Sequence, residues 1–264
     1  MEKIKIVINP EYMNHISLSG FIKRLPAIFD KNGVTLYADR NVIKQFVIDE
    51  ADSILKNVIV KRYKFPNIIQ RIAYSFFRHS KAKRAFYNAI KLRRLGIDTP
   101  QEIAFLEHWK NGLFAYGYYF SGYDNDPAIR EQLNPDNFNT VMAEDFARFA
   151  VELHEKGILF HDLNSTNVRY CLQDNGEYYR FSLIDINRMN FSPENKPVSK
   201  KDCFENLTRF TGKMDLFEFV IRCYAKKRNW DIEMSVNQAI AIKKKHDKRW
   251  MRKFRPFVRR EADV

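Results

Sequence analysis

The chain contains 264 residues, 45% of them hydrophobic, and carries a formal net charge of +13. This length can bury the core of one domain or of two joined lobes, and no internal repeat or low-complexity segment indicates a fibrous or disordered protein. Three widely spaced cysteines without a CxxC pair argue against a disulfide framework and a zinc site. No signal-peptide core and no apolar run of roughly 20 residues is present, so we expect a cytoplasmic protein.

The charges are distributed unevenly along the chain. Residues 56–97 hold 12 basic residues and no acid, and residues 243–260 hold 10 basic residues against one acid. Between them, residues 98–242 hold 16 basic residues and 22 acids. Two basic surfaces flanking an acidic middle predict an anionic partner that is met at defined places, with solubility alone as the alternative.

The first third of the chain is rich in β-branched and aromatic residues with partial alternation, which is typical of strands. We expect four strands there, in KIVINP, VTLYADRN, VIKQFVID and NVIVKRYKF, with Gly33 in a turn before the second. A helix is expected over Ile68–Leu95, ended by Gly96. A strand pair, EIAFLEHW and LFAYGYYF, then surrounds an Asn111-Gly112 turn.

The segment from Gly122 to Pro127 is the best candidate linker, and we expect lobes at residues 1–121 and 122–264. In the second lobe, AEDFARFAVELHEKGI predicts an amphipathic helix over Ala143–Ile158 that stops at Gly157. A hairpin, NVRYCL and YYRFSLIDI, is expected to turn at residues 174–176, and helices follow from about Lys200. This order predicts an α+β fold with a small strand-rich lobe before a larger helical lobe.

Three polar residues of the second lobe point to metal chemistry. Asp162 and Asn167 lie in FHDLNSTN, directly after the amphipathic helix, and Asp185 follows the returning strand of the hairpin. The two ends of a hairpin lie side by side, so the three side chains should converge. Apolar neighbours make the site of Asp185 costly for an unpaired carboxylate, and Mg²⁺, which prefers oxygen ligands, would offset that cost.

An upstream lysine completes a phosphoryl-transfer set. Lys61 ends Val58-Ile59-Val60-Lys61, a pattern similar to the V-A-I-K strand of protein kinases. Such enzymes need an acid near the attacking hydroxyl, an amide and an acid for the metal, and a lysine on the nucleotide phosphates. The order of Lys61, Asp162, Asn167 and Asp185 matches this requirement.

The stretches EKGILFHDLNSTNVRY, SLIDINR and SKAKRAFYNAIKLRRLGIDTPQEIAFLE resemble the lipopolysaccharide core kinase family of the Kdo/WaaP type, a branch of the protein-kinase-like superfamily. The resemblance covers about Asn57 to Arg188. It implies a bilobal protein-kinase-like fold, ATP and Mg²⁺ as cofactors, and a sugar hydroxyl (Kdo or heptose) of the lipid A–core region as acceptor. Carried over, Asp162 is the catalytic base, Asn167 and Asp185 bind metal, and Lys61 binds ATP.

The sequence departs from this pattern in three places. Phe160 stands where kinases usually place His, and His161 is expected to be an ordinary loop residue. Residues 67–97 contain no acid to pair with Lys61; Asn88 is the amide in the segment where the αC glutamate would fall. Lys61 could pair with Asp185, reach phosphate unaided, or belong to a slow or inactive enzyme. No GxGxxG loop is present, so we expect Arg40, in the turn after VTLYAD, to contact phosphate.

The basic surfaces are the expected contacts with partners. Aromatic residues interleave with cations over Arg71–Arg94 and in the tail Lys243–Arg260, a composition suited to anionic lipid or to RNA. The resemblance favours the lipid A–core acceptor and the inner face of the cytoplasmic membrane over nucleic acid. Two other functions stay open: a small-molecule phosphotransferase of the aminoglycoside type, disfavoured by the basic surplus, and a pseudokinase scaffold.

Overall fold

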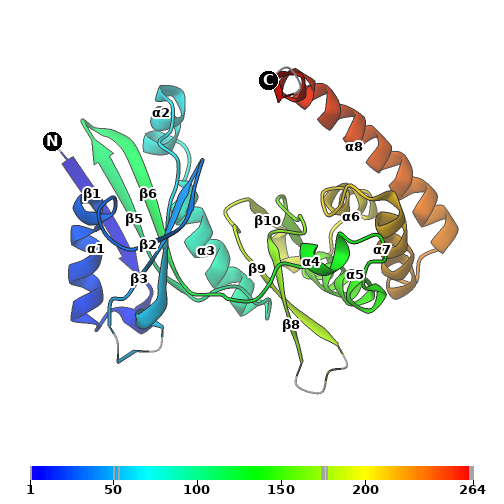
Figure 1. The fold of residues 1–264 in the computed structure, drawn as a ribbon, viewed down its shortest axis with the longest axis horizontal. Helices are drawn as coiled ribbons and strands as arrows, with labels where there is room; N and C mark the ends of the chain where they lie inside the picture. The colour runs from blue at the N-terminus through cyan, green and yellow to red at the C-terminus, as the bar shows by residue number, and fades with distance from the viewer. Residues whose placement is uncertain (1, 50, 53, 174–175, 177, 262–264) are drawn as a thin grey trace. The chain divides into compact units, whose positions relative to one another are not determined.

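The computed structural model describes residues 2–49, 51–52, 54–173, 176 and 178–261. The chain forms two compact units (Figure 1). The first comprises Met1–Asn125 together with Leu183–Arg188, and the second comprises Asp126–Ser182 and Met189–Val264. The segment Leu183–Arg188, which carries Asp185, therefore packs with the first unit although its neighbours in sequence belong to the second.

The first unit is built on an antiparallel sheet whose six strands follow the order β1-β5-β6-β4-β3-β2. At the β5–β6 turn, Asn111 and Gly112 both adopt positive φ angles, 53° and 75°, as a tight two-residue hairpin requires. The strands are β1 Glu2–Ile8, β2 Val34–Ala38, β3 Val42–Phe46, β4 Val58–Arg62, β5 Glu102–Lys110 and β6 Leu113–Gly122. These strands lie where the alternating sequence pattern predicts them.

A helix covers each face of this sheet (Figure 1). Side chains alternate between the two faces along a strand. Leu106 therefore belongs to the hydrophobic core between the sheet and helix α1 (Ile16–Ile28), whereas Phe105 packs against Phe86 of helix α3 (Lys81–Arg94). Helix α1 was not expected in the strand-rich first third. Its apolar residues at helical spacing, among them Leu18, Ile22 and Leu25, are fully buried.

The helix expected over Ile68–Leu95 is wrong in one respect, because the structure has two helices there. Helix α2 spans Ile68–Phe76, and α3 begins after Ser80, whose side chain accepts a hydrogen bond from the Lys83 amide (3.1 Å). Ser80 is thus the N-cap of a second helix. The spacing of apolar residues over Ile68–Leu95 predicts one continuous helix without this break. Gly96 follows α3 with φ of 73°, as expected for a residue just beyond a helix end.

The second unit packs helix α5 (Thr140–Glu155) against α7 (Met214–Lys227). Two small two-stranded sheets accompany these helices: β7 (Ile158–Phe160) with β10 (Met189–Phe191), and β8 (Val168–Leu172) with β9 (Tyr179–Leu183). Of the expected hairpin turn, Asp174 and Asn175 lie outside the described residues. The remaining helices are α4 Arg130–Leu133, α6 Lys200–Leu207 and α8 Ile232–Glu261.

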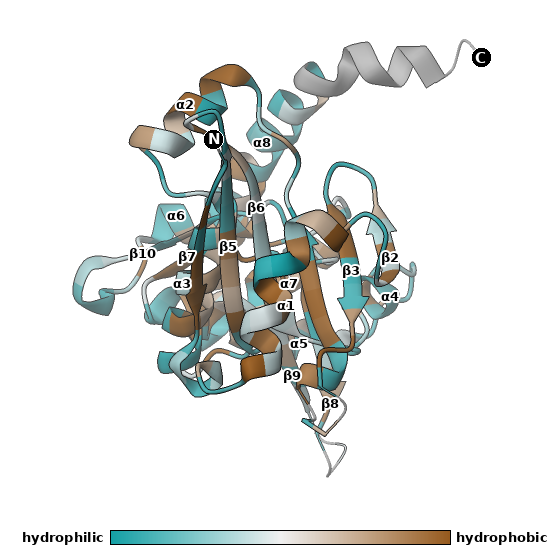
Figure 2. Ribbon diagram, turned by 90° about the vertical axis from the view of Figure 1, so that its left-hand side faces the viewer, coloured by the Kyte–Doolittle hydropathy of each residue, from teal (hydrophilic) through white to brown (hydrophobic). Residues whose placement is uncertain are grey.

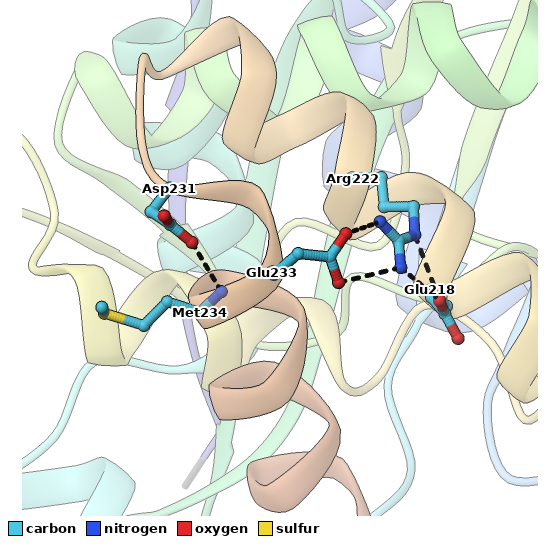
Figure 3. Close-up of polar contacts among 5 residues, drawn as sticks. All are labelled: Glu218, Arg222, Asp231, Glu233 and Met234. Atoms are coloured by element: carbon cyan, nitrogen blue, oxygen red, sulfur yellow. Dashed lines mark hydrogen bonds and ion pairs between the residues drawn. The ribbon is translucent and has the colours of Figure 1, made fainter.

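The junction of α7 and α8 is fixed by charged contacts (Figure 3). Arg222 on α7 donates to Glu218 on its own helix and, through Nη1, to Glu233 on α8 (2.6 Å). Asp231 accepts a hydrogen bond from the Met234 amide (2.7 Å) and so caps α8. Further along α8, Lys243 is fully buried and its Nζ donates to the Thr211 carbonyl (2.8 Å). This first residue of the basic tail is therefore a packing residue and faces no external partner.

The α+β class expected from the sequence is confirmed, with a strand-rich antiparallel first unit and a mainly helical second unit. Among the described residues, no helix combines the length and the apolar character that crossing a bilayer requires.

Candidate functional site

Lys61 lies near the end of β4, and the alternation of that strand decides which face it uses. The neighbouring Arg62 points to the α1 face, where its guanidinium binds Asp30 (2.8 Å) and lies over the Phe29 ring. Lys61 therefore points to the opposite face, the one covered by α3, together with Tyr63, whose ring centroid is 5.3 Å from Lys61 Nζ. The register leaves Lys61, and not Arg62, on the α3 face.

The carboxylate partner of Lys61 is Asp185. Lys61 Nζ lies 2.7 Å from Asp185 Oδ1, and the lysine side chain is only 12% exposed. This pairing is one of the alternatives that the sequence left open when no acid was found over residues 67–97. Because half-buried ion pairs are screened less than surface pairs, the contact holds both side chains in place.

Asp185 has an unusual backbone conformation. Its φ angle is 55°, in the left-handed region that residues with a side chain adopt rarely and at a free-energy cost. A second contact fixes its carboxylate, since Asn187 Nδ2 donates to the same Oδ1 (2.7 Å). Lys61 and Asn187 thus both orient the carboxylate through Oδ1.

Helix α3 contacts the Asp185 segment through an amide. Asn88 Nδ2 donates to the carbonyl oxygen of Ile186, the residue after Asp185 (2.7 Å). At the other end of the segment, Thr99 Oγ1 donates to the Leu183 carbonyl (2.7 Å), and the Leu183 amide donates to the backbone carbonyl of Asp98 (2.9 Å). Asn88, noted in the sequence as the amide in place of an αC acid, therefore holds the backbone beside Asp185.

Two further cations, Lys81 and Arg40, act on the same region. Lys81, the first residue of α3, lies 5.9 Å from the Tyr63 ring centroid, so this ring contacts both Lys61 and Lys81. Burial lowers the pKa of Lys81, and the nearby charges of Arg40 and Arg84 lower it further. Burial raises the pKa of Tyr63, with the Asp185 charge as the next cause. Sequence reasoning placed Lys81 only within the basic segment Arg71–Arg94, because the Ser80 cap that begins α3 was not recognised.

Asp162 and Asn167 share one loop in the second unit. Asn167 Nδ2 donates to the backbone carbonyl of Asp162 (2.9 Å), which ties the amide to the acid five residues earlier. Between them, Asn164 Oδ1 accepts from the Thr166 amide (3.0 Å), from the Thr166 hydroxyl (2.6 Å) and from the Asn167 amide (3.2 Å). Asn164 thus forms an Asx turn that shapes the loop, a role that the sequence analysis did not assign.

The loop is anchored to a buried polar network beneath it. Asn206 Nδ2 donates to the Phe160 carbonyl (2.8 Å), and Asn206 Oδ1 lies 3.0 Å from His154 Nε2. Burial lowers the pKa of His154 to about 4, so the imidazole is neutral and its ring is held between Asn206 and Tyr224. The His161 carbonyl accepts from Arg209 Nη1 (2.9 Å). These contacts support the backbone on both sides of the turn.

Asn167 and Asp185, which belong to different units, each carry oxygen atoms of the kind that Mg²⁺ binds. Asn167 donates through its Nδ2, so its carbonyl Oδ1 is the atom that could bind a metal, and the Asp185 carboxylate is held through Oδ1. Within the described residues, no group of three or more His, Cys, Asp or Glu is placed to hold a metal. Mg²⁺ commonly binds through one or two carboxylates plus substrate phosphates and water, so a site with few protein ligands is compatible with this ion.

The structure therefore brings the expected site residues together as two sets. Lys61 and Asp185 form an ion pair in the first unit, where Arg40 acts on Lys81 beside them. Asp162 and Asn167 are joined in the second unit. Convergence of Asp162, Asn167 and Asp185 remains a prediction.

No protein-family model matches the chain, and no curated protein matches it either. Among solved structures, WaaP in complex with acyl carrier protein is similar with a TM-score of 0.59 at 11% identity, covering 92% of this chain and 98% of that chain. Two structures of the Rio2 kinase from Chaetomium thermophilum, one an ADP/Mg²⁺-phosphoaspartate complex, have 12% identity and TM-scores of 0.45 and 0.46. They cover 92% and 93% of this chain and 82% and 83% of those chains. With the strand-rich and helical units described above, the similarity to WaaP shows that the chain has a protein-kinase-like fold.

Proposed function

We propose that this chain is an ATP- and Mg²⁺-dependent phosphotransferase. The observation that carries the proposal is the Lys61–Asp185 pair at 2.7 Å, held in a protein-kinase-like fold by Asn187. Phosphoryl transfer depends on positioning and on charge stabilisation, and an oriented lysine and carboxylate supply both. Lys61 and Arg40 bind the ATP phosphates, and Lys81 adds a third cation.

Asp162 is the catalytic base in this proposal. A hydroxyl oxygen of the acceptor attacks the γ-phosphorus of ATP, the bond to the β-phosphate oxygen breaks, and ADP leaves. The proton of the hydroxyl passes to the Asp162 carboxylate. Mg²⁺, when bound by Asn167 and Asp185, neutralises the charge that develops on the phosphate oxygens. The Asn167 hydrogen bond to the Asp162 carbonyl keeps base and metal ligand in one rigid loop.

The acceptor in our proposal is a sugar hydroxyl, of Kdo or heptose, in the lipid A–core region of lipopolysaccharide. The support is the resemblance of EKGILFHDLNSTNVRY and SLIDINR to the lipopolysaccharide core kinases, together with the similarity of the fold to WaaP. A lipid-linked acceptor would also suit a peripheral location at the cytoplasmic face of the inner membrane.

One observation favours a second candidate, a nucleotide-binding pseudokinase. Helix α3 carries no carboxylate to hold Lys61, and its Asn88 amide donates to the Ile186 carbonyl. In this alternative the Lys61–Asp185 ion pair stays closed and the chain acts as a scaffold. The intact set of Asp162, Asn167 and Asp185 favours the enzyme.

The experiment that tests the proposal is transfer of ³²P from γ-labelled ATP to purified Kdo–lipid A. Wild type should label the lipid fraction, and Asp162→Asn should reduce the rate by at least about a hundredfold because the proton acceptor is lost. ATP affinity should be nearly unchanged in that variant, since Asp162 does not contact the nucleotide phosphates in our scheme. ATP binding without any transfer would support the scaffold instead.

A further inference from the structure

Helix α2 is attached to the first unit by its polar side chains. Arg71 Nε donates to the Phe114 carbonyl (2.9 Å), and its Nη2 donates to the Lys110 carbonyl (3.3 Å). One turn later, Ser75 Oγ accepts from the Phe114 amide (2.8 Å), and the Tyr74 ring packs on the Phe114 ring. The face of α2 that contacts the protein is therefore the face that carries its hydrogen-bonding groups.

The apolar face of α2 is exposed. No residue of the helix is buried, and brown, hydrophobic segments mark it in Figure 2. Ile69 is 75% exposed and Phe76 is 68% exposed, and Phe77, just after the helix, is 84% exposed. Ile68 and Ile72 are exposed as well. An amphipathic helix normally buries this face, so its exposure indicates a surface that an apolar partner covers.

A cationic cavity of about 360 Å³ lies at the C-terminal end of this apolar face. Phe76 and Phe77 belong to its lining, and the cations Lys3, Lys5, Arg78 and Lys83 line it as well. Glu107 is the acid of the lining, and it stands directly opposite Lys5 in the β1–β5 pairing. Burial lowers the pKa of His79, which also lines the cavity, and the nearby Lys83 charge lowers it further. The cavity therefore has a surplus of positive charge beside exposed aromatic rings.

We propose that α2 and the cationic cavity form a docking site for an anionic lipid monolayer. The isoleucine and phenylalanine side chains enter the interface between head groups and acyl chains, and the lysines and Arg78 bind lipid phosphates. This combination of an apolar stripe with flanking cations is complementary to a phospholipid surface. The phosphate backbone of RNA would match the charge but would leave Ile68, Ile69 and Ile72 in water.

The test is sedimentation of the full chain with vesicles, without nucleotide or acceptor. Wild type should bind phosphatidylglycerol vesicles well and pure phosphatidylcholine vesicles weakly. The pair Ile69→Ser with Phe77→Ser should weaken binding to phosphatidylglycerol vesicles by at least about tenfold, because two apolar side chains no longer leave water. Met13→Ser with Ile16→Ser is the matched control, since both residues are exposed apolar residues of the same unit. Its binding should equal that of wild type.

A second pair of variants tests the cavity. Lys5→Gln with Lys83→Gln should lower affinity for phosphatidylglycerol and leave the weak binding to phosphatidylcholine unchanged, whereas Lys23→Gln with Lys31→Gln should have little effect.

Circular dichroism melting identifies any variant that fails to fold. If the α2 pair fails to fold, the single substitution Phe77→Ser replaces it. Absence of wild-type binding, or equal loss in test and control pairs, would overturn the proposal. So would unchanged vesicle binding of the α2 pair, which would assign docking to another surface such as α8.

Because the vesicles contain neither ATP nor a sugar acceptor, this result is independent of the proposed phosphotransferase activity. An active enzyme that ignores vesicles would contradict the docking site alone. An inactive chain that binds vesicles through α2 would contradict the enzyme alone.

Discussion

Asn88 occupies a decisive position among the individual residues of the candidate site. The sequence predicted Asn88 in the segment where kinases place a carboxylate that pairs with the strand lysine, and in the structure this amide holds the backbone after Asp185. Lys61 pairs with Asp185 instead. The carboxylate that contacts the lysine therefore lies in the segment that follows β9.

Asn88→Ala should lower turnover more than it lowers stability. The lost hydrogen bond to Ile186 costs about 1 kcal/mol of folding free energy, because the variant leaves the carbonyl without its donor. Release of the backbone beside Asp185 should reduce kcat by about tenfold or more. Steady-state kinetics and urea denaturation measure the two effects. Arg94→Ala, an exposed change on the same helix, should alter neither, and a drop in stability without any change in kcat would contradict a positioning role.

Sequence reasoning predicted single residues of the candidate site but not their contacts. Motif order led to the predictions for Lys61, Asp162, Asn167 and Asp185, since each residue type carries its own chemistry. The Asn88 contact was not predictable, because no local pattern shows which backbone a helix side chain will meet 98 positions away. The positive φ of Asp185 was also unforeseen, since φ depends on the contacts that hold the segment.

Among the elements, the contacts of His154 make the support of the loop over residues 162–167 sensitive to pH. The pKa of His154 is lowered from 6.5 to about 4 by burial, so the unfolded chain binds more protons than the folded chain between these values. Stability contributed by the neutral ring is therefore complete above pH 6.5 and is lost as the pH falls toward 4.

When the pH is lowered from about 7 to about 5, protonation of His154 in the unfolded chain should lower the folding stability of wild type by roughly 2 kcal/mol. His154→Gln should be less stable at neutral pH, yet its stability should fall less over the same interval. Urea denaturation of both proteins at the two pH values measures the difference, and the other histidines cancel in the comparison. Equal pH dependence of the two proteins would show that His154 does not titrate in the way its burial requires.

The start of α8 depends on a capping residue. Asp231 accepts from the Met234 amide, and Asp231→Ala should destabilise the second unit by about 1 kcal/mol (Figure 3). Asp231→Asn keeps an acceptor at this position and should restore most of the loss. Thermal melting of the three proteins provides the comparison. Identical melting of wild type and the alanine variant would exclude a capping contribution.

The ends of helices and strands were predicted correctly where a residue that tolerates positive φ stands at the boundary. Gly96 and the Asn111-Gly112 turn were placed correctly because glycine and asparagine tolerate positive φ. Helix α1 was missed because strand patterns on both sides of it dominated the interpretation. The break between α2 and α3 was missed because a serine cap is a weaker signal than the apolar spacing around it.

In the whole molecule, one short segment packs with a different unit from the residues on either side of it in sequence. Leu183–Arg188 leaves the second unit and packs with the first, so the chain crosses between units three times. The α+β class was predictable because strand and helix periodicities separate along the sequence. Membership of the Asp185 segment was not, because it depends on Asn88, Thr99 and Asp98, residues distant in sequence.

The affinity of the chain for ATP with and without Mg²⁺, measured for wild type and for Asp185→Asn, tests whether the proposed nucleotide site exists. Wild type should bind ATP more tightly with Mg²⁺ than without it. The factor by which Mg²⁺ raises the ATP affinity should be at least about tenfold smaller in Asp185→Asn, because an amide replaces the proposed carboxylate ligand. Calorimetric titration of the folded proteins gives both values. No ATP binding by folded wild type, or an unchanged Mg²⁺ effect in Asp185→Asn, would contradict the phosphotransferase site.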